Sequence, residues 1–96
     1  MSDFWTRFNA RVAAQPLLPR MTSAGFEAAP NGGNCEAWRK LRASGGYVLV
    51  CTDACGFDVE HPDDVWLVGA YSSDDDEGVC EEFADIDAAL TYAATL

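Results

Sequence analysis

Two apolar runs decide the fold: Tyr47-Val48-Leu49-Val50-Cys51-Thr52 and Val65-Trp66-Leu67-Val68-Gly69-Ala70-Tyr71. Both are rich in β-branched and aromatic residues, both have the length of a strand, and both are bounded by Gly, Pro and Asp. We therefore expect them to form the central antiparallel pair of a small sheet, with the residues between them as the connecting loop.

Two turn signals before the central pair indicate that further strands precede it in the sheet. Pro30-Asn31-Gly32-Gly33 is a strong turn signal, and Ala43-Ser44-Gly45-Gly46 is a short turn just before the central pair. The simplest arrangement is a meander of four strands, at roughly 26–29, 35–41, 47–52 and 65–71. A fifth short strand at Val79–Phe83 remains open.

Helical spacing appears at both ends of the chain. Phe4, Trp5, Phe8 and Val12 form an amphipathic stripe, with Ser2 as the expected N-cap and Pro16 ending the helix near Ala14. In the last segment, Asp85 is the expected N-cap, and the residues that share one helix face are Ile86, Ala89, Leu90 and Ala93.

A short helical turn, opened by Pro19 and closed by Gly25, is also indicated between Leu17 and Ala24. No internal repeat and no linker divides the chain. We therefore expect one α+β domain over residues 1–96: a small antiparallel β-meander of about four strands with an N-terminal and a C-terminal helix.

The central strands are apolar on both faces, so both faces need a cover. Tyr47, Leu49 and Cys51 point one way, and Val48, Val50 and Thr52 point the other. The two helices pack either one on each face or both on one face. The second arrangement leaves a face for a dimer mate or a target.

Charge is divided unevenly along the 96 residues, whose net charge is −10. All six basic residues lie before residue 43, and thirteen of the sixteen acids lie after it. A nucleic-acid-binding protein needs a basic footprint, so direct binding to DNA or RNA is disfavoured, as is binding to an anionic membrane. The negative electrostatic potential of the chain favours a basic partner instead, either a protein or a protein–RNA complex.

The N-terminus lacks the pattern of a secretory signal, and no stretch approaches the roughly 20 apolar residues of a membrane span. We expect a cytoplasmic protein with reduced cysteines.

The acids form two clusters that are candidate partner contacts. The first lies between the central strands and the second follows them. A sheet aromatic residue, Trp38, joins them as a candidate interface contact. The candidate residues are Asp53, Asp58, Glu60, Asp63, Asp64, Asp74, Asp75, Asp76, Glu77, Glu81, Glu82 and Trp38.

Three interpretations of the acidic clusters are open. They can serve solubility alone. They can bind calcium, although the run Ser73–Gly78 lacks the ligand spacing of an EF-hand. They can imitate a nucleic-acid backbone, because alternate residues of an extended chain project about 7 Å apart on one side, close to two phosphate steps.

The cysteines permit two further interpretations, and we favour neither. Cys51 and Cys55 could bind zinc with His61 and either Cys35 or Cys80. Cys55 and His61 could form a nucleophile pair, but nearby carboxylates raise the pKa of a thiol and disfavour the thiolate. We therefore expect no catalytic residues, no metal and no cofactor, and a protein that is not an enzyme.

The runs Gly32–Ala37, Gly45–Asp53 and Val68–Tyr71 resemble small proteins of phages and mobile elements. In size and acidity the chain resembles phage anti-CRISPR proteins, which bind a CRISPR effector complex and block its contact with target DNA. The resemblance implies a stoichiometric inhibitor whose acidic side chains occupy a basic surface of a Cascade-type or similar effector. It also implies that a phage-encoded protein of this kind acts in the cytoplasm of the host cell. The alternatives are a dimeric interaction module whose acids serve solubility only, or a small zinc or thiol protein.

Overall fold

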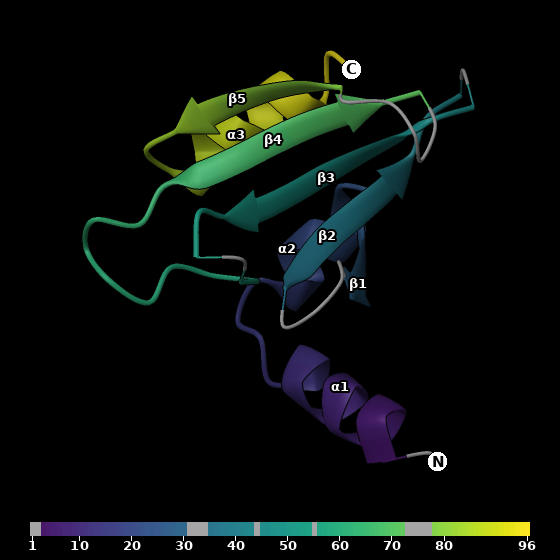
Figure 1. Ribbon diagram of the computed structural model, residues 1–96, viewed down its shortest axis with the longest axis vertical. Helices are drawn as coiled ribbons and strands as arrows, with labels where there is room; N and C mark the ends of the chain where they lie inside the picture. The colour runs from purple at the N-terminus through teal and green to yellow at the C-terminus, as the bar shows by residue number, and fades with distance from the viewer. Residues whose placement is uncertain (1–2, 31–34, 44, 55, 73–77) are drawn as a thin grey trace.

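The sheet is a five-stranded antiparallel meander in the order β1-β2-β3-β4-β5. The computed structural model (Figure 1) describes residues 3–30, 35–43, 45–54, 56–72 and 78–96. The elements are α1 (Asp3–Ala13), α2 (Leu18–Ser23), β1 (Glu27–Pro30), β2 (Glu36–Leu41), β3 (Tyr47–Thr52), β4 (Trp66–Tyr71), β5 (Val79–Phe83) and α3 (Ile86–Ala93). The expected α+β meander is confirmed, with five strands instead of about four.

The central pair forms as the sequence predicts. β3 and β4 are antiparallel, with Tyr47 opposite Tyr71 and Thr52 opposite Trp66. The fifth strand, which the sequence left open, pairs with β4 and places Glu82 opposite Leu67. β5 satisfies the backbone groups that β4 would otherwise leave unpaired at the edge of the sheet.

The helix ends follow from local chemistry. α1 stops three residues before Pro16. α2 has Pro19 in its first turn, and Gly25 follows it at φ +93°, a conformation that favours glycine. The Asp85 side chain caps α3 by accepting a hydrogen bond from the Ala88 amide at 2.8 Å. The other expected cap, Ser2, lies outside the described residues.

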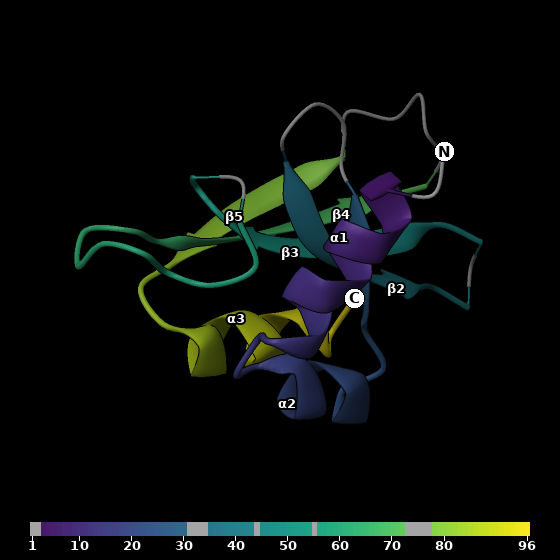
Figure 2. The same ribbon diagram turned by 90° about the horizontal axis from the view of Figure 1, so that it is seen from below.

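The core lies on one face of the sheet, where α2 and α3 lie side by side (Figure 2). Val48, Val50 and Val68 point to that face and are buried. α1 reaches the same core through Phe8, whose ring contacts that of Phe57. The sequence allowed its N-terminal and C-terminal helices to share one face or to take one face each; in the structure α3 packs on the core face, and α1 reaches the core through Phe8.

The opposite face of the sheet carries no helix in the described part of the chain, and Figure 1 views the molecule from that side. No described helix is both long and apolar enough to cross a membrane.

Candidate functional site

The loop of residues 53–65, here called the acidic loop, joins β3 to β4 and is held closed by backbone hydrogen bonds. The Asp53 amide donates to the Val65 carbonyl at 3.0 Å, and the Thr52 amide donates to the Gly56 carbonyl at 3.0 Å. The Thr52 hydroxyl accepts from the Gly56 amide at 3.1 Å. The loop therefore has a defined conformation of its own.

Three carboxylates stabilise this conformation. Asp64 accepts hydrogen bonds from the amides of Glu60 at 2.8 Å and His61 at 3.0 Å. These backbone hydrogen bonds, from Glu60 first and then His61, hold the pKa of Asp64 below its usual value. Asp58 accepts from the Val59 amide at 2.8 Å, and Asp53 accepts from the Val65 amide at 3.3 Å.

Four other carboxylates lie exposed beside this framework. Glu60 and Asp63 are on the acidic loop, and Glu81 and Glu82 are on β5. The two groups lie at the same end of the sheet, because the acidic loop leads directly into β4 and β5 pairs with the start of β4. We call Glu60, Asp63, Glu81 and Glu82 the acidic surface.

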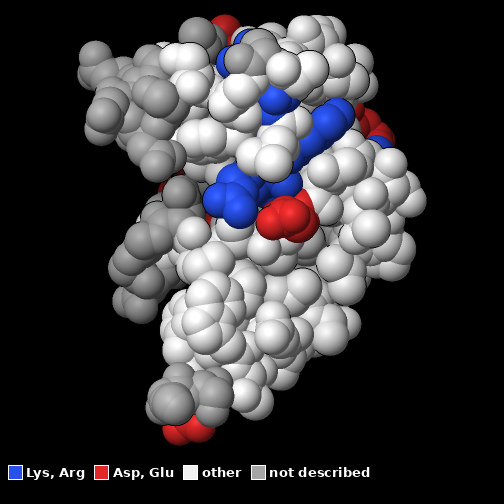
Figure 3. Space-filling model, turned by 90° about the vertical axis from the view of Figure 1, so that its right-hand side faces the viewer, with Lys and Arg blue, Asp and Glu red and all other residues white. Residues whose placement is uncertain are grey.

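In the described part of the chain, no Lys or Arg side chain forms an ion pair with a carboxylate of the acidic surface. The ion pairs join Arg11 to Glu36 at 2.5 Å, Arg39 to Glu27 at 3.4 Å, and Arg20 to Asp87. Arg39 and Lys40 lie on β2 and Arg42 follows it, and on the face that Figure 3 shows, blue Lys and Arg atoms form a cluster with few red acidic atoms beside it. The negative charge of the acidic surface is therefore not neutralised by these ion pairs.

One candidate contact needs correction. Trp38 has an exposed fraction of 0%, and its Nε1–H donates to the Phe57 carbonyl at 2.9 Å. Its ring packs against Phe57, with centroids 4.8 Å apart. Trp38 is a core residue and cannot contact a partner without unfolding. Four further candidates, Asp74, Asp75, Asp76 and Glu77, lie outside the described residues.

A row of carboxylates spaced like phosphates does not form on β5. Glu81 and Glu82 are consecutive, so their side chains project to opposite faces of the sheet. Among the described residues, an imitation of a nucleic acid would therefore draw on the acidic loop and β5 together.

The described residues contain no group of three or more His, Cys, Asp or Glu side chains placed to hold a metal ion. Cys55, on which both the zinc and the nucleophile interpretations depend, lies outside those residues. Cys51 is half-buried within β3, and His61 is exposed on the acidic loop.

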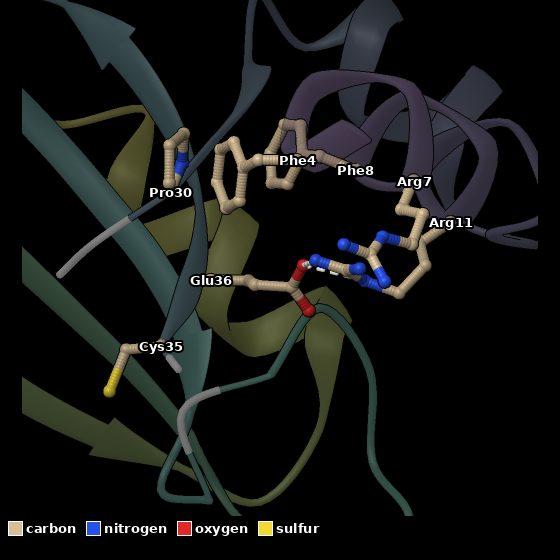
Figure 4. Close-up of a pocket in the computed structure, with 7 residues that line it drawn as sticks. All are labelled: Phe4, Arg7, Phe8, Arg11, Pro30, Cys35 and Glu36. Carbon is tan, nitrogen blue, oxygen red and sulfur yellow. Dashed lines mark hydrogen bonds and ion pairs between the residues drawn. The ribbon is translucent and has the colours of Figure 1, made fainter. Parts of the chain in front are cut away.

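A cavity of about 400 Å³ lies between α1 and the β1–β2 side of the sheet (Figure 4). Arg11 donates to the Glu36 carboxylate from Nε at 3.0 Å and from Nη2 at 2.5 Å. The lining residues are Phe4, Arg7, Phe8, Arg11, Pro30, Cys35 and Glu36. No local pattern in the sequence predicts this cavity, because Arg11 and Glu36 are 25 residues apart and only the tertiary fold brings them together.

Comparison with protein-family models, with curated proteins and with solved structures finds no match for this chain.

Proposed function

We propose that this protein is a non-enzymatic binding protein whose acidic surface occupies a basic, nucleic-acid-binding surface of a partner. The observation that carries the proposal is the position of Glu60, Asp63, Glu81 and Glu82, which are exposed and form no ion pair with a Lys or Arg among the residues that the structure describes. Unpaired surface carboxylates are available to the Lys and Arg side chains that otherwise hold phosphates.

The closed conformation of the acidic loop supports this function. Asp53, Asp58 and Asp64 accept hydrogen bonds from the loop backbone, so the loop is ordered before a partner arrives. A preorganised loop loses less conformational entropy on binding than a flexible one. The carboxylates that shape the loop are thus distinct from the carboxylates offered to the partner.

The partner that we propose is a CRISPR effector complex of Cascade type. Such effectors hold nucleic acid in a positively charged channel, and the chain resembles anti-CRISPR proteins in its size and acidity. Bound there, the acidic surface would exclude target DNA without any chemical step. Because the contacts join charged groups, the affinity should fall steeply with added salt.

A variant that neutralises part of the acidic surface tests this proposal. Glu60→Gln, Asp63→Asn and Glu81→Gln together should weaken binding to the effector about tenfold, the sum of three modest surface charge contacts. Binding of both proteins to the immobilised effector is measured over a range of salt concentrations, and the variant should also show the weaker salt dependence.

A matched control distinguishes the effect of this surface on binding from the effect of the protein's net charge. Asp3→Asn, Glu27→Gln and Asp87→Asn change the net charge by the same amount but lie on α1, β1 and α3. This control should bind within about twofold of the unmodified protein, because its acids lie outside the contact. An equal loss in both triple variants would contradict the proposed surface.

A further inference from the structure

We propose that the cavity between α1 and the β1–β2 side of the sheet binds a small organic anion, a carboxylate that carries an aromatic ring. We call this site the α1 cavity. It shares no residue with the acidic surface, so the inference goes beyond the proposed function and does not depend on it.

The α1 cavity has the size of a site for a small ligand. Its volume is about 400 Å³. Voids inside protein cores seldom exceed the volume of a water molecule, whereas sites for small ligands span roughly 300–1,000 Å³. The cavity therefore has room for a small organic molecule at the lower end of that range.

One side of α1 forms a wall of the cavity. Phe4, Arg7, Phe8 and Arg11 follow one another at intervals of three and four residues, which places them on the same side of the helix. Phe8 is buried and joins the helix to the core, whereas Phe4, one turn earlier, has an exposed fraction of 47%. A ligand in the cavity would cover the exposed part of the Phe4 ring and gain the free energy of burying it.

The polar side of the cavity carries a positive charge that no described carboxylate neutralises. Arg11 donates to the Glu36 carboxylate from two nitrogen atoms, at 3.0 and 2.5 Å, so these two charges balance. Arg7 forms no ion pair within the described residues, and its Nε–H donates to the Asp3 carbonyl of its own helix at 3.4 Å. The two terminal nitrogens of the Arg7 guanidinium can therefore bind a carboxylate as a bidentate pair.

The other side of the cavity is apolar. Figure 4 shows the rings of Phe4, Phe8 and Pro30 on one side and the charged groups on the other. The Phe4 and Phe8 rings are nearly parallel, with an interplanar angle of 15° and centroids 5.9 Å apart. The guanidinium carbon of Arg11 lies 5.7 Å from the centroid of the Phe8 ring, so the two sides adjoin. A ligand that fits both sides has an aromatic ring for the first and an anionic group for the second.

The charges of the site favour a carboxylate over a phosphate. A carboxylate carries a single negative charge, which matches the unpaired charge of Arg7. A phosphate monoester carries close to two negative charges near neutral pH and would place the second one beside Glu36, in a protein whose net charge is −10. We therefore assign the site to a ligand with one negative charge.

A titration of the isotope-labelled protein with sodium phenylpropanoate tests the site by nuclear magnetic resonance. The amides of α1 and the start of β2 should show saturable shifts, with a dissociation constant of about 1 mM or below. Phenylpropanol lacks the charge and propanoate lacks the ring, so each should bind at least about tenfold more weakly. Phenyl phosphate should also bind more weakly than phenylpropanoate.

Two variants separate the polar side of the cavity from the apolar side. Arg7→Gln should weaken the binding of phenylpropanoate about tenfold and leave that of phenylpropanol unchanged. Phe4→Ala should weaken the binding of both probes about fivefold, because it removes apolar contact area. Phe4 is half-exposed and Arg7 is exposed, so both variants should keep the fold.

Arg39→Gln is the matched control for Arg7→Gln. Arg39 is exposed on β2, three residues from Glu36 and therefore on the other side of the strand. This control removes the same charge and should leave the dissociation constant for phenylpropanoate within about twofold.

The absence of saturable shifts up to about 20 mM phenylpropanoate would overturn the proposal, as would equal binding of propanoate or equal losses in Arg7→Gln and Arg39→Gln. Tighter binding of phenyl phosphate would overturn the assignment to a carboxylate. The titration uses this protein alone, so its failure would leave the proposed function of the acidic surface untouched, and a failure of the effector assay would leave this site untouched.

Discussion

At the scale of the residue, Asp64 shows how a loop carboxylate acts on the fold itself. It accepts two backbone hydrogen bonds, from Glu60 and His61, and its pKa lies below the usual 3.8. A carboxyl whose pKa is lower in the folded than in the unfolded state stabilises the fold above its unfolded pKa. That contribution is lost as the pH falls through the folded pKa.

Asp64→Ala should therefore be less stable than the unmodified protein near neutral pH, and the difference should shrink as the pH falls below about 4. Urea unfolding at several pH values measures it. Asp63→Ala is the matched control, since it removes an exposed carboxylate from the same loop. A difference for Asp64→Ala that stays constant with pH would contradict the assigned role of its carboxylate.

Trp38 shows where residue-level prediction from sequence ends. The composition around it suggests a half-exposed strand position between Glu36 and Lys40. Its burial depends on Phe57, which lies 19 residues away in the acidic loop and accepts its Nε1–H. No local pattern encodes that contact, so an aromatic residue of the core is easily taken for a surface contact.

At the scale of the element, Gly46 controls how closely β3 and β4 can approach. A Cβ at Gly46 would lie 1.9 Å from the Tyr71 carbonyl oxygen, a backbone atom. At Gly69 the nearest atom is instead the hydroxyl oxygen of Tyr71, at 2.6 Å, which lies at the end of a side chain. A side chain can rotate away from a new methyl group, whereas a paired strand must shift.

Gly46→Ala should therefore destabilise the protein by about 2–4 kcal/mol, and Gly69→Ala by about 1–2 kcal/mol with loss of the Tyr47–Tyr71 stacking. Urea unfolding gives both free energies, and near-ultraviolet circular dichroism reports the tyrosine pair. A smaller cost at Gly46 than at Gly69 would contradict the close approach of the two strands.

The elements were largely predictable because their signals are local. The β3–β4 pair, the Asp85 cap and the glycine after α2 follow from composition and turn chemistry over a few residues. β5 was left open because Val79–Phe83 contains two adjacent acids and acquires its strand conformation by pairing with β4. Which face the helices cover was not decided by the sequence, since β3 and β4 are apolar on both faces.

At the scale of the whole molecule, the meander turns a division of charge along the sequence into a division in space. Strands follow one another in chain order across the sheet, so the basic first half lies toward β1 and the acidic second half lies toward β5. In the described residues the three ion pairs leave the acidic surface unpaired. A fold with a crossover connection would have mixed the two halves. The charge division was readable from the sequence, but its persistence in three dimensions depends on this topology.

The measurement that tests the central claim most directly is competition between this protein and target DNA for a Cascade-type effector. Fluorescence anisotropy of labelled target DNA follows the fraction bound as the protein is added. The account predicts that the protein displaces the DNA, that raising the salt weakens the displacement, and that neutralising Glu60, Asp63 and Glu81 shifts the midpoint about tenfold. DNA that stays bound at saturating protein, or displacement unchanged by that triple substitution, would contradict it.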